Sequence, residues 1–69
     1  MTAYVFKLSG QSGRTYFYAA EATNQSEAAQ KVAERIGGHS FSVMLEKTFT
    51  YPSILEASYR HPVDFVVVE

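Results

Sequence analysis

The pattern of apolar and polar residues predicts two strands joined by a turn at the start of the chain. Residues 3–8, Ala-Tyr-Val-Phe-Lys-Leu, are rich in the aromatic and β-branched types that favour strands. Residues 9–13 contain two glycines and three polar residues, a composition typical of a hairpin loop. Residues 14–22 form the predicted return strand, so we expect the chain to begin with a β-hairpin.

The return strand leads into the one convincing helical pattern of the sequence. Asn24 stands three residues before Glu27, where the side-chain oxygen of an N-cap residue can accept a hydrogen bond from the first turn. Apolar residues then repeat at every fourth position, at Ala28, Val32 and Ile36. This spacing predicts a narrow apolar stripe that packs on a sheet, and the two glycines at 37–38 predict the end of the helix.

Alternation with a period of two predicts a third strand after the helix. Phe41, Val43 and Leu45 alternate with polar residues, which is the clearest strand pattern in the chain. We expect this strand to continue toward Tyr51, until Pro52 removes a backbone donor.

The last quarter of the chain predicts a short helix or turn and a final strand. Ser53 and Glu56 repeat the Ser-x-x-Glu capping pattern, so residues 54–59 are expected to turn before Pro62 ends the segment. Residues 63–68 are then the last strand. The predicted fold is a single α+β domain over residues 1–69, with an antiparallel sheet of three to four strands in the sequence order β-β-α-β-β and one main helix packed on one face.

Alternation of side chains along the strands predicts which residues lie away from that helix. If Ala20 and Ala22 face the helix, the opposite face carries Val5, Phe17, Ala19, Met44 and some of Val66 and Val68. One helix covers one face, so the other would expose an apolar strip, and exposed apolar strips usually mark interaction sites. Alternatively, residues 47–62 fold back over the strip. The predicted partner-binding residues are Val5, Phe17 and Met44 on the sheet, with Phe49, Tyr51 and Tyr59 from the flanking segment.

Composition narrows the chemistry that the protein can perform. The chain has 69 residues and no cysteine, which excludes disulfides and thiolate metal sites. A domain of this size buries only about 60% of its unfolded surface, so a protein partner or a second copy is a plausible source of stability. The two histidines, His39 and His61, lie far apart in the sequence, and we find no Ser-His-Asp arrangement, paired acids or phosphate loop. We therefore expect a non-enzymatic protein without a cofactor or a metal ion.

Charge and hydropathy bear on nucleic acids and membranes. The net charge is -1 and the six Lys and Arg residues are evenly spread, which argues against a broad nucleic-acid footprint. The run Arg14-Thr15-Tyr16-Phe17-Tyr18 nevertheless has the basic and aromatic residues with which sheets stack bases, so a single-stranded nucleic-acid-binding module is the alternative function. No apolar run approaches the roughly 20 residues that a membrane span needs, and we expect a cytoplasmic protein.

The first two thirds of the chain resemble a class of small viral proteins. The hairpin, the segment Glu21-Ala22 followed by Asn24, the run Ser26-Glu27-Ala28 and the apolar residues 41–45 resemble short proteins encoded by bacteriophages, including some anti-CRISPR inhibitors of type I surveillance complexes. The resemblance covers about residues 3–46 and implies a protein-protein interaction module that occludes a host nucleoprotein complex in the host cytoplasm. The lysine-rich surface of some such inhibitors is not evident in this chain, and the resemblance assigns no functional residue.

Overall fold

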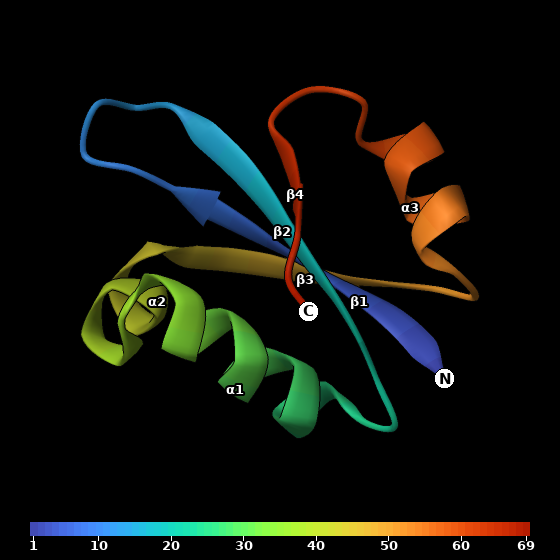
Figure 1. Ribbon diagram of the computed structural model, residues 1–69. Helices are drawn as coiled ribbons and strands as arrows, with labels where there is room; N and C mark the ends of the chain where they lie inside the picture. The colour runs from blue at the N-terminus through green and yellow to red at the C-terminus, as the bar shows by residue number, and fades with distance from the viewer.

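The computed structural model describes residues 1–69 as one four-stranded sheet with helices on both of its faces (Figure 1). The elements in chain order are β1 (Thr2–Ser9), β2 (Thr15–Ala22), α1 (Gln25–Ile36), α2 (Gly38–Met44), β3 (Leu45–Tyr51), α3 (Ile54–Arg60) and β4 (Phe65–Val67). The strand order is β3-β1-β2-β4. The α+β class is confirmed, but the expected antiparallel sheet with one main helix is wrong, because β4 runs parallel to β2 and the protein has three helices.

The predicted hairpin forms the centre of the sheet. β1 and β2 pair antiparallel from Thr2 opposite Ala22 to Ser9 opposite Thr15. Gly13 has a positive φ of 81°, a backbone conformation that glycine adopts without the steric cost of a Cβ. The hairpin therefore lies where the alternation of residues placed it.

The predicted cap, helix and helix stop are also confirmed. The Asn24 side chain accepts a hydrogen bond of 2.8 Å from the backbone N–H of Glu27. Ala28 and Val32 are fully buried against the sheet. Gly37, with a φ of 94°, ends α1 and donates its N–H to the Ala33 carbonyl at 2.7 Å.

The larger core lies between the sheet and the two helices α1 and α2. Its buried members are Phe6, Leu8, Ala20, Ala22, Ala28, Val32, Phe41 and Val68. The rings of Phe6 and Phe41 meet edge to face, with centroids 5.3 Å apart. Because Val68 belongs to this core, its expected placement on the opposite face is wrong.

Residues 41–45 do not form the strand that their alternation predicted. Residues 38–44 form α2, and β3 begins at Leu45 and continues to Tyr51. Phe41 is buried and Met44, one turn later, packs against the same core, whereas Val43 is 69% exposed. In a seven-residue segment, apolar positions three apart fit a helix while positions two apart fit a strand, and contact between Phe41 and Phe6 favours the helix.

The end of the chain passes over one face of the sheet, and α3 forms part of this crossover. The predicted short helix is confirmed at Ile54–Arg60, and the predicted last strand is limited to three residues. β3 lies at one edge of the sheet and β4 at the other, so the crossover carries α3 over a sheet face and returns β4 parallel to β2. Arg14 pairs with Asp64 at 2.7 Å at the start of β4, and Phe17 donates its N–H to the Asp64 carbonyl at 2.9 Å.

Candidate functional site

α3 lies on the sheet face that α1 and α2 leave uncovered (Figure 1). The centre of this contact is a second small core of Val5, Ala19 and Ala57, all fully buried. The methyl side chain of Ala57 allows the helix to approach the strands closely. The expectation of an open apolar strip is therefore wrong. The alternative, in which residues 47–62 fold back over the strip, holds for α3 and His61 only, because residues 47–51 belong to β3 within the sheet.

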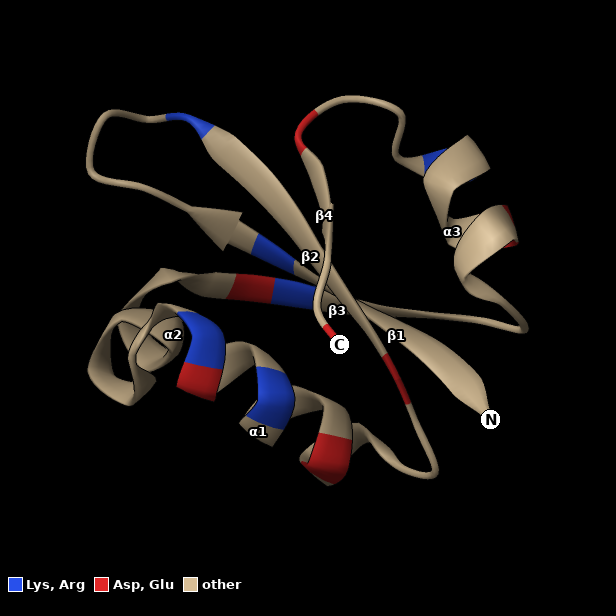
Figure 2. Cartoon of the chain, viewed as in Figure 1, with Lys and Arg blue, Asp and Glu red and all other residues tan.

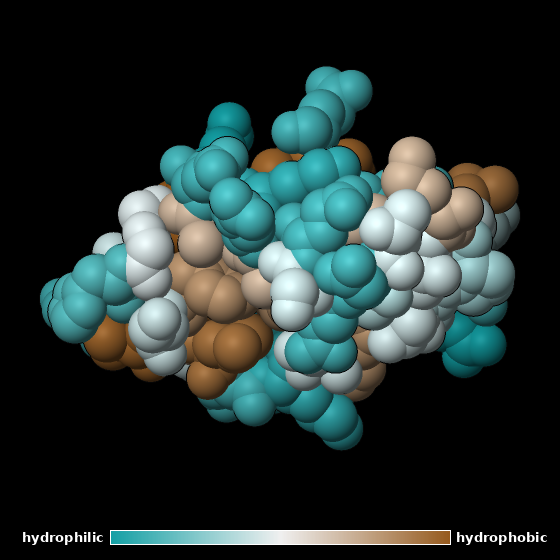
Figure 3. All heavy atoms as spheres, turned by 90° about the horizontal axis from the view of Figure 1, so that it is seen from below, coloured by the Kyte–Doolittle hydropathy of each residue, from teal (hydrophilic) through white to brown (hydrophobic).

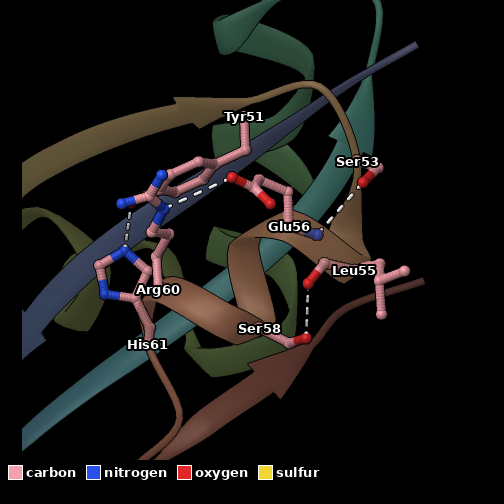
Figure 4. Close-up of polar contacts among 7 residues, drawn as sticks. All are labelled: Tyr51, Ser53, Leu55, Glu56, Ser58, Arg60 and His61. Carbon is pink, nitrogen blue, oxygen red and sulfur yellow. Dashed lines mark hydrogen bonds and ion pairs between the residues drawn. The ribbon is translucent and has the colours of Figure 1, made fainter.

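Local hydrogen bonds explain why α3 forms at this point of the chain. Ser53 Oγ accepts from the backbone N–H of Glu56 at 3.2 Å, which satisfies a free donor of the first turn. Glu56 and Arg60, four residues apart, form an ion pair at 3.4 Å. Figure 4 shows both interactions, together with the hydrogen bond of 2.8 Å from Ser58 Oγ to the Leu55 carbonyl.

His61, the residue after α3, joins the helix to three aromatic side chains of the sheet. Its ring centroid lies 4.4 Å from that of Phe17, 4.9 Å from that of Phe49 and 5.5 Å from that of Tyr51. Tyr51 Oη and His61 Nε2 form a hydrogen bond of 2.7 Å (Figure 4). We call Phe17, Phe49, Tyr51 and His61 the aromatic cluster. It fastens the end of α3 to β2 and β3.

Burial lowers the pKa of His61 below its ordinary value of 6.5, so the ring is neutral at neutral pH. A neutral imidazole has one donor and one acceptor nitrogen, and either can pair with a phenol. At the edge of the cluster, the hydrogen bond from Arg14 lowers the pKa of Asp64. Both groups are thus held in the ionisation state that the observed packing requires.

The outward side of α3 presents large apolar side chains to solvent. Leu55 is 69% exposed and Tyr59, four residues later, is 75% exposed. Val63, in the loop after the helix, is 68% exposed. We call Leu55, Tyr59 and Val63 the α3 surface. Seen from below, the molecule is covered largely by hydrophilic atoms. Hydrophobic atoms gather there toward the end where α2 lies (Figure 3).

The structure brings together four of the six predicted partner-binding residues. Val5 lies buried beneath α3, and Phe17, Phe49 and Tyr51 are half-buried around it in the aromatic cluster. Tyr59 points outward on the α3 surface. The predicted position of Met44 beside Val5 and Phe17 is wrong, because Met44 belongs to α2 and packs against the core on the other face. Partner binding by these residues stays a prediction.

Sequence reasoning missed Leu55, Val63 and His61. The Ser53 cap fixes the start of α3, and a helix started there puts Leu55 and Tyr59 on one side, four residues apart. The same period aligns Ala57 with His61 on the side that faces the sheet. The signal for an inner and an outer side of this helix was therefore present in residues 53–61.

The aromatic run of β2 is divided between the two faces of the sheet. Tyr16 and Tyr18 are half-buried with ring centroids 6.5 Å apart, and Tyr18 packs against the larger core. Phe17 lies on the opposite face, where His61 covers it. The rings of this run are thus partly buried on both faces, and binding of single-stranded nucleic acid stays a prediction.

The candidate site is a surface rather than a cavity. Three shallow depressions have volumes of about 340, 340 and 380 Å³, and none is lined by the aromatic cluster. No three His, Asp or Glu side chains gather where they could hold a metal ion. The arrangement is suited to contact with another molecule.

None of the three helices has the length and apolar character needed to cross a membrane. Comparison of the chain with protein-family models, curated proteins and solved structures found no match. The function is therefore inferred from the surfaces of this chain.

Proposed function

We propose that the protein is a small, non-enzymatic protein-binding module whose contact region is the α3 surface. The observation that carries this proposal is the exposure of Leu55, Tyr59 and Val63, each more than two thirds open to solvent. Leu55 and Tyr59 are neighbours one turn apart on α3. Neighbouring exposed apolar side chains favour an interaction site, and tyrosine is enriched at the centres of protein interfaces.

The spacing of the exposed residues favours one mode of recognition. Leu55 and Tyr59 lie one helical turn apart, as do the anchor residues of a helix that binds in an apolar groove. The Glu56–Arg60 ion pair borders these residues, with both side chains at least 40% exposed. The partner that fits is a protein with an apolar groove and a polar rim.

The attachment of α3 to the sheet supports the same proposal. Ser53 caps the helix, Ala57 is buried against the strands and His61 is held by the aromatic cluster. A helix held in place before it binds loses less conformational entropy than a segment that orders on binding. The exposed anchors are therefore presented in a defined geometry.

The resemblance to phage proteins suggests what the partner is. We propose that the module acts by occlusion, as an inhibitor that covers a protein interface of a larger host nucleoprotein complex. Type I surveillance complexes are the first candidates. This role needs no catalytic group and no cofactor, and it uses the α3 surface as the contact.

Site-specific photo-crosslinking tests the contact region. The crosslinking amino acid p-benzoyl-phenylalanine is placed at Tyr59 in one protein and, as the control, at Val43 in another. Val43 is exposed to 69% on α2, so it matches the exposure of the α3 surface but lies on the other side of the sheet. We expect a defined crosslinked partner from position 59 and none from position 43.

A matched pair of substitutions then tests the energetics with the purified crosslinked partner. Leu55→Ser and Val43→Ser remove side chains of equal 69% exposure from the two sides of the molecule. We expect Leu55→Ser to weaken binding at least about tenfold, and Val43→Ser to leave it unchanged. Equal effects of both, or crosslinking from position 43 alone, would contradict the proposal.

A further inference from the structure

Two lysines lie opposite each other on the sheet face that carries α3. They are at the end of this face that the helix does not cover. Lys7 of β1 is in register with Lys47 of β3 on one side and with Phe17 of β2 on the other. Residues directly opposite on antiparallel strands have Cβ atoms about 5 Å apart on the same face of the sheet. Lys47 Nζ lies 5.1 Å from the ring centroid of Phe49, which places it on the α3 side. Figure 2 shows the basic positions of β1 and β3 near each other.

Neither lysine has an acidic partner. The ion pairs of the protein are Arg14 with Asp64 and Arg60 with Glu56. Glu46 precedes Lys47 at the irregularity in the β1–β3 pairing but forms no ion pair with it. Like charges directly opposite on neighbouring strands repel and destabilise a sheet. An anion bound between the two ammonium groups would remove this repulsion.

We propose that Lys7 and Lys47 bind the phosphate group of a small ligand. Ser9, two residues after Lys7 in β1, pairs with Thr15 of β2 on the same face of the sheet, and both residues offer hydroxyl donors. A phosphate dianion has several oxygens, so it can accept from both ammonium groups at once. The aromatic cluster borders the two lysines, because Phe17 lies opposite Lys7 and the Phe49 ring lies close to Lys47. The site lies apart from the α3 surface and does not depend on the proposed partner protein.

NMR titration of the full chain tests this site. Backbone amide shifts are followed as sodium chloride is replaced at constant ionic strength by inorganic phosphate, by a mononucleotide or by a short single-stranded oligonucleotide. We expect inorganic phosphate and the mononucleotide to shift the amides of residues 7 and 47 and their neighbours. Binding of the oligonucleotide alone would overturn the proposal in favour of a nucleic-acid surface.

Variants with the same change in net charge test whether phosphate binding depends on Lys7 and Lys47 themselves. Loss of one charged hydrogen bond in Lys7→Gln or Lys47→Gln should weaken phosphate binding about tenfold. Glu46→Gln should strengthen it. Arg35→Gln on α1 changes the net charge as Lys7→Gln does and should have no effect. Lys47 is exposed on an edge strand, so its variant keeps the test decisive if Lys7→Gln disturbs folding.

Two further results would overturn the phosphate site. Equal weakening by Arg35→Gln and Lys47→Gln would show that phosphate responds to net charge alone. Absence of any phosphate-dependent shift would leave Lys47 with the role of protecting the β3 edge from pairing with other strands.

Discussion

The two faces of the sheet are packed to different extents. The face under α1 and α2 contains eight buried residues, including the large side chains of Phe6, Leu8 and Val32. The buried cluster under α3 contains three, and two of these are alanines. Because burying a large apolar side chain contributes about 1.5–3 kcal/mol, most of the stability comes from the first face. The second face contributes less to stability, and the helix packed on it carries the exposed α3 surface.

This difference has a consequence for dynamics. Segments with few buried apolar side chains open locally at a lower free energy than global unfolding requires. α3 depends on Ala57, on half-buried neighbours such as Ile54 and on the aromatic cluster. We therefore expect α3 to detach from the sheet more readily than α1.

The largest effect is expected from a charge placed in the first face. Val32→Asp buries an unpaired carboxylate and should cost about 4 kcal/mol or more, a large part of the stability of a small domain. Thermal melts followed by circular dichroism measure the loss, with the conservative Glu34→Asp change at an exposed site of α1 as the control. A melting temperature for Val32→Asp within about two degrees of wild type would contradict the placement of α1.

Truncation of Phe17 should have a smaller effect, centred on the second face. The open apolar strip predicted from the sequence would leave Phe17 without contacts that stabilise the monomer. Because Phe17 packs against His61 at 4.4 Å, we now expect Phe17→Ser to cost about 2 kcal/mol and to loosen α3. Urea unfolding measures the cost, and the chemical shifts of residues 54–61 report on the helix. An unchanged midpoint with unchanged shifts would mean that α3 does not rely on this contact.

The two helix caps provide a matched comparison of the faces. Asn24→Ala and Ser53→Ala each remove a side-chain hydrogen bond to the third residue of a helix and should each cost about 1 kcal/mol of helix stability. We expect the loss at Asn24 to lower global stability in full. The loss at Ser53 should appear mainly as faster hydrogen exchange in α3. Equal reductions in global stability would show that both helices unfold together with the sheet.

The smallest effect is a pH dependence confined to the second face. Burial lowers the pKa of His61. Between pH 6.5 and this lowered pKa, the unfolded chain therefore binds a proton that the folded protein does not bind. The stability contributed by neutral His61 is complete above pH 6.5 and falls as the pH drops from there toward the lowered pKa. His61→Gln should flatten this part of the stability profile, and His39→Gln on α2 should leave it intact. A profile that does not change in His61→Gln would contradict the packing of His61.

Several features of the fold follow directly from local chemistry in the sequence. The hairpin, the Asn24 cap, the stop at Gly37 and the Ser53 cap all depend on residues close in the chain, and all were predicted correctly. The helical conformation of residues 38–44 depends on a contact between Phe41 and Phe6, which are far apart in the sequence. Alternation of apolar residues over so short a segment cannot reveal that contact.

The candidate site was harder to predict because it depends on the path of the crossover. Alternation placed Val5 and Phe17 on the same face correctly. It could not show that β4 returns beside β2, so that the crossover carries α3 across that face. The apolar residues expected to be open are consequently covered, and the exposed residues are those on the outer side of the covering helix.

Native-state hydrogen exchange measured residue by residue tests the difference between the two faces most directly. The amides of Ala57 and His61, which donate to the Ser53 and Ala57 carbonyls at 3.1 and 3.0 Å, report on α3, and the amide of Val32 reports on α1. We expect the α3 amides to exchange through a local opening whose free energy is at least about 1 kcal/mol lower than that of Val32 and depends little on denaturant. Equal opening free energies with equal denaturant dependence at all three positions would contradict the account.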